Sequence, residues 1–230
     1  MTKKRVNMRN LKSQIRKDLG LNEAYVTASK KFDLNTELLS QKAKKAHSNL
    51  YDDYSDKLNV VSAQLDVAER ESANPNYSYY RCLKQEEIHN LNGSYLHTLH
   101  FDNISDLNSV ITMDSITFLR LERDFGTFED WQKDFIACAL SARNGWALTV
   151  YSTVLGRYLN IMVDGNTSHI PVGCFPIFCL CVNEAAYFRD YLDDRKSYIY
   201  AMMKEVNWNM VEGRVKDAER IAKLLSKGAK

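Results

Sequence analysis

Apolar side chains in the first third of the chain recur at intervals of three, four and seven residues. The recurring positions are Leu39, Ala43, Ala46, Leu50, Tyr54, Leu58, Val61 and Leu65. Such a stripe buries one face of a helix, so the spacing predicts a long helix from Thr36 to Arg70. Thr36 can cap its start, and Glu37 places negative charge in the first turn. Asn74-Pro75-Asn76 ends this helix, and a second helix is expected from Leu83 to Phe101.

The second half of the chain carries one amphipathic helix and then three strand-like runs. The buried face of the helix is made by Phe128, Trp131, Phe135, Cys138 and Ala139. The apolar runs extend from Trp146 to Tyr151, from Arg157 to Val163 and from Phe175 to Val182. Three antiparallel strands flanked by helices predict an α+β fold.

Composition narrows the class of protein. A chain of 230 residues with 45% hydrophobic residues can bury the core of one large domain or two small ones. It contains no run of about 18 apolar residues, so no membrane span is expected. The N-terminus lacks an apolar core segment and a small-residue cleavage site, which favours a cytoplasmic or intracellular location. The five cysteines include no C-x-x-C pair, a pattern typical of reduced thiols.

Positive charge is concentrated at the N-terminus. Residues 1–31 carry nine basic and two acidic side chains, whereas the rest of the chain carries 22 basic and 27 acidic ones. Val6, Met8, Leu11, Ile15 and Leu19 recur at roughly helical spacing, so part of this arm is expected to form a helix on a partner. The arm could contact an acidic protein surface, nucleic acid or a membrane surface, or remain a solvated tail.

Three stretches resemble the iron/manganese superoxide dismutases. They are HTLHFDNI from His97, GTFEDWQKDFIACALSARNGWALTVY from Gly126, and FPIFCLCVNEAAYFRDYLDDRKSYIYAMMKEVNWNMVEGR from Phe175. The resemblance implies a long N-terminal helical hairpin followed by an α/β domain with a three-stranded antiparallel sheet. On this basis we expect a basic arm at 1–35, a hairpin domain at 36–104 and a C-terminal α+β domain at 105–230.

The resemblance also implies which residues face the metal. His47 and His97 stand at two of the family's four ligand positions, whereas Cys181 and Ala185 stand at the aspartate and histidine positions of the other two. The family's gating tyrosine would fall at Ser55, next to Tyr54. Tyr51 stands where the family has a histidine at its dimer interface. Tyr51 and Tyr54 are therefore candidates for a vestigial gate.

Residues around the ligands are also altered in part. Glu184 retains the glutamate that reaches across the family's dimer interface. The glutamine that orients metal-bound solvent in manganese members is absent, and Asn166, Ser168 or His169 could replace it. His97 and His100 form an H-x-x-H pair on one helical face, which could seat a metal alone.

This altered set of ligands leaves three functional hypotheses. Two imidazoles alone bind a redox metal weakly, so the leading expectation is a non-catalytic structural or interaction protein with no cofactor. Its partners would form an oligomer or a larger assembly such as a virus particle, with residues 1–31 as the extra binding element. The alternatives are an active dismutase using iron or manganese, and a His/His/Cys site in which Cys181 favours zinc.

Overall fold

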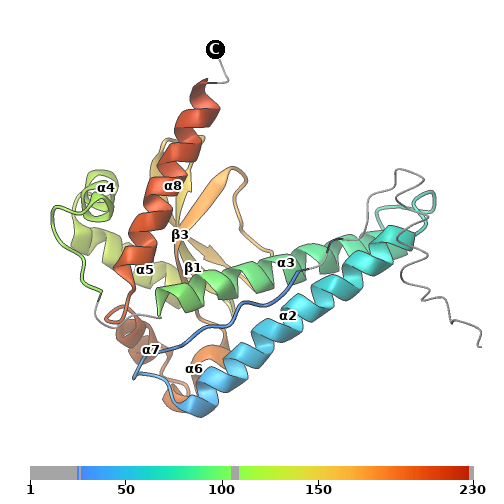
Figure 1. The fold of residues 1–230 in the computed structure, drawn as a ribbon, viewed down its shortest axis with the longest axis horizontal. Coiled ribbons are helices and arrows are strands. Elements are labelled where there is room, and N and C mark those ends of the chain that lie inside the picture. Colours follow the sequence, from blue (N-terminus) through green and yellow to red (C-terminus); the bar gives the residue numbers. More distant parts are fainter. Residues whose placement is uncertain (1–24, 26, 105–108, 228–230) are drawn as a thin grey trace, which may run out of the picture.

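The computed structural model describes residues 25, 27–104 and 109–227 of the chain. Two long antiparallel helices, α2 (Gln41–Val67) and α3 (Tyr79–Asn103), form a hairpin that extends to one side of the molecule (Figure 1). The other described elements gather around one end of this hairpin (Figure 1). The α+β fold expected from the sequence is confirmed.

The first helix begins later than the sequence predicts. Ser40 caps α2 by accepting a hydrogen bond from the amide of Ala43 at 3.2 Å. The predicted cap at Thr36 is wrong, because the Thr36 hydroxyl is buried and donates to the carboxylate of Glu205. Both residue types cap helices well, and the contact with Glu205 decides between them.

Three antiparallel strands form the sheet in the order β2-β1-β3. Its members are β1 (Trp146–Ser152), β2 (Arg157–Val163) and β3 (Cys174–Cys181), close to the predicted runs. The pairing of β1 with β3 shifts between Thr149 and Val150. Beyond this irregularity Trp146 lies opposite Cys181, so β1 and β3 bring both side chains to the same end of the sheet.

Five further helices follow the hairpin in the described part of the chain. These are α4 (Ile116–Phe125), α5 (Phe128–Ser141), α6 (Glu184–Tyr191), α7 (Arg195–Met202) and α8 (Trp208–Lys227). Trp131 of α5 is fully buried, and its Nε1 donates to the hydroxyl of Thr149 at 2.9 Å. One apolar core runs from Tyr51 and Leu96 of the hairpin into the sheet and α8. The three-part domain division remains a prediction.

The segment that precedes α2 packs along the hairpin (Figure 1). The amide of Lys30 donates to the Tyr51 hydroxyl at 2.9 Å, and the ring of Phe32 lies 5.4 Å from that of Phe101. Most of the predicted arm, residues 1–24 and 26, lies outside the described residues. Within the described part of the chain, no helix combines the length and apolar character needed to cross a bilayer.

Candidate metal centre

The hairpin brings three histidines together. The ring centroid of His47, on α2, lies 4.9 Å from that of His97 and 5.3 Å from that of His100, both on α3. The donor atoms of His47, His97 and Cys181 all lie within 4.8 Å of one another. These three residues form the donor cluster. Cys181 is fully buried and each of the two histidines is 2% exposed.

The buried histidines have unused nitrogen atoms. The Nε2 atoms of His47, His97 and His100 have no hydrogen-bond partner in the described part of the chain. Leaving a buried polar group unpaired costs about 1–3 kcal/mol, and such groups in native proteins call for an explanation. A metal ion would satisfy the lone pairs on Nε2 of His47 and His97, whereas Nδ1 of His100 accepts from the Cys181 amide at 3.4 Å, which leaves the ring proton on Nε2.

The hydrogen bond of His97 determines which of its nitrogens can bind a metal. Its Nδ1 lies 2.6 Å from the carbonyl oxygen of Gly93. A carbonyl oxygen only accepts, so Nδ1 carries the proton of the neutral ring and Nε2 keeps its lone pair. Metal-bound histidines commonly donate their other N–H in this way.

Burial sets the protonation states of the cluster. It lowers the pKa of His97 to about 4, and together with repulsion from His97 and His100 it holds the pKa of His47 well below the usual value. Burial also raises the pKa of the Cys181 thiol to about 12. At neutral pH the imidazoles are therefore ready to bind a metal, whereas the thiol must first lose its proton.

The C-terminal stretch holds Cys181 in place. The Tyr198 hydroxyl donates to the carbonyl oxygen of Cys181 at 2.8 Å. Arg195, on the same helix, donates to the carbonyl oxygens of Ala139 and Ala142, where α5 ends. The first contact holds the backbone of Cys181 at the end of β3 against α7, and the others join α7 to the end of α5.

Ala185 and Glu184 lie outside the donor cluster. Both are exposed at the start of α6, and they line an open groove of about 590 Å³ together with Asp53 and Phe188. The methyl group of Ala185 provides no donor atom. The expected role of Glu184 across a dimer interface stays a prediction.

The two candidate gate tyrosines occupy different surroundings. The ring of Tyr54 lies 5.3 Å from that of His97, whereas the buried Tyr51 hydroxyl also hydrogen-bonds Thr98 at 3.2 Å. Ser55, at the position of the family's tyrosine, is buried and shares a 2.9 Å hydrogen bond with Ser94. Tyr54 is thus the half-buried tyrosine beside the cluster.

Asn166 is the loop residue that reaches this region. Its Oδ1 accepts from Nε1 of Trp146 at 3.0 Å, and the Trp146 ring lies 4.7 Å from that of His97. His169 is instead exposed, with its Nδ1 3.7 Å from the carboxylate of Asp164, and Ser168 pairs with Asp164 through the backbone. Of the three loop candidates, Asn166 is therefore the one that contacts the donor cluster indirectly, through the Trp146 ring that packs against His97.

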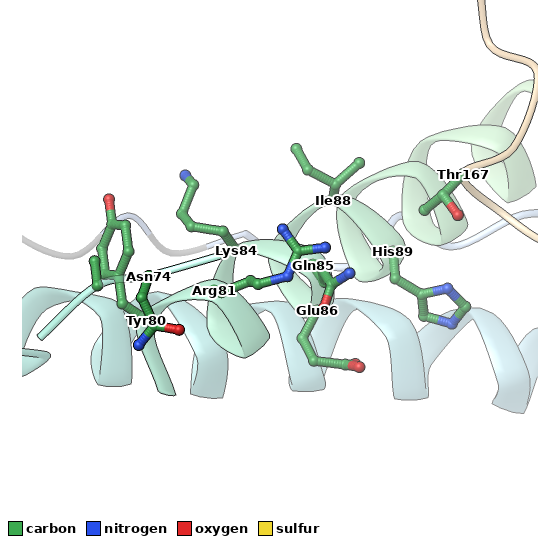
Figure 2. A pocket seen from close by; sticks show the side chains of 10 residues that line it. Asn74, Tyr80, Arg81, Lys84, Gln85, Glu86, Ile88, His89 and Thr167 are labelled. Atoms are coloured by element: carbon green, nitrogen blue, oxygen red, sulfur yellow. The ribbon is translucent and has the colours of Figure 1, made fainter. Parts of the chain in front are cut away.

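A larger surface groove of about 950 Å³ lies along α3 (Figure 2). Figure 2 shows Lys84 and Ile88 pointing away from α2 and His89 pointing toward it. None of the donor cluster residues lines this groove. The candidate metal site is therefore identified by its buried donor atoms and not by the volume of the surface groove.

The donors of the cluster suit some metals better than others. Two imidazoles and one thiolate suit iron or zinc, whereas manganese prefers oxygen ligands. The unpaired Nε2 atoms of His47 and His97 and the sulfur of Cys181 fit iron as a resident metal. The missing carboxylate makes the fit to manganese poorer.

The fold and the donor cluster together define an α+β protein with a long helical hairpin and a buried group of side chains that could hold a metal ion. Residues 116–214 match the family model for iron/manganese superoxide dismutases, C-terminal domain. The superoxide dismutase [Fe] of Cupriavidus metallidurans is 32% identical over 79% of this chain and 91% of its own length. The chain belongs to the iron/manganese superoxide dismutase family.

The names of other relatives specify iron in one case and manganese in another. The superoxide dismutase [Fe] of Aquifex aeolicus is 31% identical over 73% of this chain and 79% of its own. The superoxide dismutase [Mn] 2 of Halobacterium salinarum is 31% identical over 74% and 83%. The family resemblance seen in the sequence is thereby confirmed.

These relatives correct two expectations. The expectation of a non-catalytic structural protein is wrong, because relatives that span most of this chain are named as dismutases. The expectation of no cofactor is wrong as well, because those names specify iron or manganese and the cluster offers three donors. Neither the comparisons nor the described residues support incorporation into a virus particle.

Proposed function

We propose that this protein is an iron-dependent superoxide dismutase. The observation that carries the proposal is the buried set of donor atoms on His47, His97 and Cys181, all within 4.8 Å of one another. Relatives from two bacterial genera named as iron superoxide dismutases support it. Bound iron would supply the electron transfer by which one superoxide becomes dioxygen and another, with two protons, becomes hydrogen peroxide.

The chain's own residues would bind the metal, hold its ligands and exclude bulk water. The Nε2 atoms of His47 and His97 and the Sγ of Cys181 would be the ligands. Asn166 would position the Trp146 ring against His97 through its 3.0 Å hydrogen bond. Tyr54, beside His97, is our candidate for delivering a proton.

Metal reconstitution tests the proposal. The full-length protein is loaded anaerobically with Fe(II), Mn(II) or Zn(II), and metal content and superoxide dismutation are measured. We expect stoichiometric iron with dismutation, loss of both in His97→Gln, and no change in the exposed His169→Gln control. Absence of bound metal, or bound iron without dismutation, would overturn the proposal.

The thiol of Cys181 supports a second candidate. A His/His/Cys set also suits zinc, which has no redox chemistry. Stoichiometric zinc that is lost in Cys181→Ser, with no dismutation by any metal form, would favour a zinc protein. Retention of iron in the purified protein would favour the dismutase.

We also propose that the protein forms an oligomer through the surface around Glu184 and Phe188. Phe188 is 53% exposed on α6 and lines the open groove that Glu184 also lines, so its ring is available to pack against a second copy of the chain. Phe188→Glu should then lower the molar mass measured by light scattering, whereas Tyr77→Glu, fully exposed on the hairpin loop, should leave it unchanged. Binding by the arm at residues 1–31, and a cytoplasmic location, stay predictions.

A further inference from the structure

Cys181 is an oxidisable side chain in a site whose proposed product is an oxidant. Its Sγ and the donor nitrogens of His47 and His97 all lie within 4.8 Å of one another. The resemblance to the family places an aspartate at this position, and hydrogen peroxide leaves a carboxylate unchanged. A cysteine sulfur, in contrast, is converted by peroxide to a sulfenic and then a sulfinic acid.

Burial separates Cys181 from peroxide in solution. Its side chain is fully buried, and the two histidines beside it are each 2% exposed. Peroxide from bulk solution therefore reaches the exposed thiol of Cys82, on α3, before that of Cys181. The proposed dismutation, however, makes hydrogen peroxide within the donor cluster itself. The source of the peroxide thus determines which of these two cysteines is oxidised.

The preceding cysteine on β3 cannot trap an oxidised Cys181 as a disulfide. Cys179 lies two residues earlier on the strand, and its Sγ donates to the carbonyl oxygen of Leu96 at 3.6 Å. A strand rises about 3.3 Å per residue, so Cβ atoms two residues apart are separated by about 6.6 Å, whereas a disulfide needs about 3.5–4.5 Å. Oxidised Cys181 is therefore expected to keep oxygen on its sulfur.

We propose that Cys181 is oxidised by the hydrogen peroxide that the protein itself makes, so that dismutation limits itself. This inference rests on the proposed function and names a modification that regulates the same site. As a metal ligand the sulfur is a thiolate, which is the nucleophilic form of cysteine. The modified sulfur is no longer the thiolate donor of the cluster, so dismutation should fall as the modified fraction rises.

The oxidation is a two-electron reaction. The sulfur attacks one oxygen of the peroxide, so an S–O bond forms and the O–O bond breaks. The other oxygen leaves with the electron pair as hydroxide, which takes up a proton to give water. The sulfur is oxidised to a sulfenic acid while the peroxide is reduced, and a second peroxide yields the sulfinic acid in the same way.

Mass spectrometry of the iron-loaded, full-length protein tests the inference after many turnovers of superoxide. We expect the peptide that contains Cys181 to gain about 16 or 32 Da, the mass of one or two oxygen atoms, in proportion to the superoxide consumed. Catalase removes peroxide from bulk solution. It should therefore protect the exposed Cys82 and leave the oxidation of Cys181 unchanged.

Metal-free protein treated with added hydrogen peroxide is the matched control. We expect oxidation of Cys82 and an unchanged mass at Cys181, because Cys181 is buried and no peroxide is made beside it. Cys82→Ser should keep both the dismutation rate and the oxidation of Cys181 at wild-type values. Prevention of Cys181 oxidation by catalase, or equally fast oxidation in the metal-free protein, would show that the oxidant comes from solution and would overturn the inference.

The outcomes also separate this inference from the proposed function. If the iron-loaded protein dismutates superoxide while Cys181 keeps its original mass, the oxidation inference fails and the dismutase proposal stands. If the protein neither binds iron nor dismutates superoxide, both are overturned.

Discussion

The ring of Tyr54 fills the space that a side chain at position 93 would need. A Cβ atom on Gly93 would lie 2.6 Å from Cδ1 of Tyr54 and 2.7 Å from its Cγ. Alanine in a helix interior is normally about 1 kcal/mol more stable than glycine. Because the clash forces the ring from its place beside His97, Gly93→Ala should instead destabilise the protein by about 1–3 kcal/mol in urea unfolding.

Gly213 is the matched control for this substitution. It is exposed on α8, and a Cβ there would meet nothing within 4 Å. Gly213→Ala should therefore raise the free energy of unfolding by up to about 1 kcal/mol. Equal stabilisation by both substitutions would contradict the packing of Tyr54 against Gly93.

Cys181 is expected to control the choice of metal. Replacing its thiol with a carboxylate, in Cys181→Asp, should shift the bound metal from iron toward manganese, because manganese prefers oxygen donors. The measurement is metal content after reconstitution with equal Fe(II) and Mn(II). Cys179→Ser is the control, since Cys179 is buried two residues earlier but lies outside the donor cluster. An unchanged iron-to-manganese ratio in Cys181→Asp would show that the thiol does not bind the metal.

Acid should destabilise the metal-free protein through its buried histidines. Burial lowers the pKa of His97 from 6.5 to about 4 in the folded protein. Between these values the unfolded chain binds a proton that the folded chain does not, so stability falls as the pH drops from 6.5 toward 4. His97 alone should contribute about 3 kcal/mol to this loss.

His97→Gln should flatten the dependence of stability on pH over that interval. Chelator-treated protein is unfolded in urea at several pH values, with His169→Gln as an exposed histidine control. A wild-type stability that stays constant from pH 6.5 to 4 would contradict burial of a neutral His97.

Arg214 should be important for joining α8 to the hairpin. Its guanidinium lies 3.1 Å from the Asp102 carboxylate, with both side chains about 15% exposed, and also donates to the Leu99 carbonyl. Arg214→Met removes the bonds to Leu99 and Asn103 and one of the two cations that pair with Asp102, the other being Lys30 at 3.2 Å, so the loss should be about 1–3 kcal/mol. Lys216→Met breaks an exposed pair with Glu212 on the same helix and should cost less than about 1 kcal/mol. Similar losses in urea unfolding would contradict this ranking.

The sequence predicted most of the fold because apolar residues recur at different intervals in strands and in helices. The strand from Arg157 to Val163 is found with the predicted bounds, and β1 begins at the predicted Trp146. The start of α2 was harder to predict because Thr36 and Ser40 are both good caps. The choice depends on Glu205, which lies far along the chain.

The sequence predicted which residues of the candidate site share a face within one helix, but not how the two helices of the hairpin align. Spacing placed His97 and His100 on a common face of α3, but whether His47 meets that face depends on how two helices align. The loop after β2 contains three polar residues that could replace the family's glutamine, Asn166, Ser168 and His169, and the local sequence does not distinguish among them. Only the contact with Trp146 distinguishes Asn166 from the others.

The start of α2 depends on residues that are synthesised much later than the helix itself. The amide of Ser40 donates to the Asp190 carboxylate at 2.7 Å, and the Tyr191 hydroxyl donates to the carbonyl of Leu38 at 3.0 Å. These partners are separated by 150 and 153 residues. On the ribosome, the helix carrying His47 therefore lacks its N-terminal anchor until α6 has left the exit tunnel. A nascent chain that stalls before Asp190 would lack both of these contacts at the start of α2.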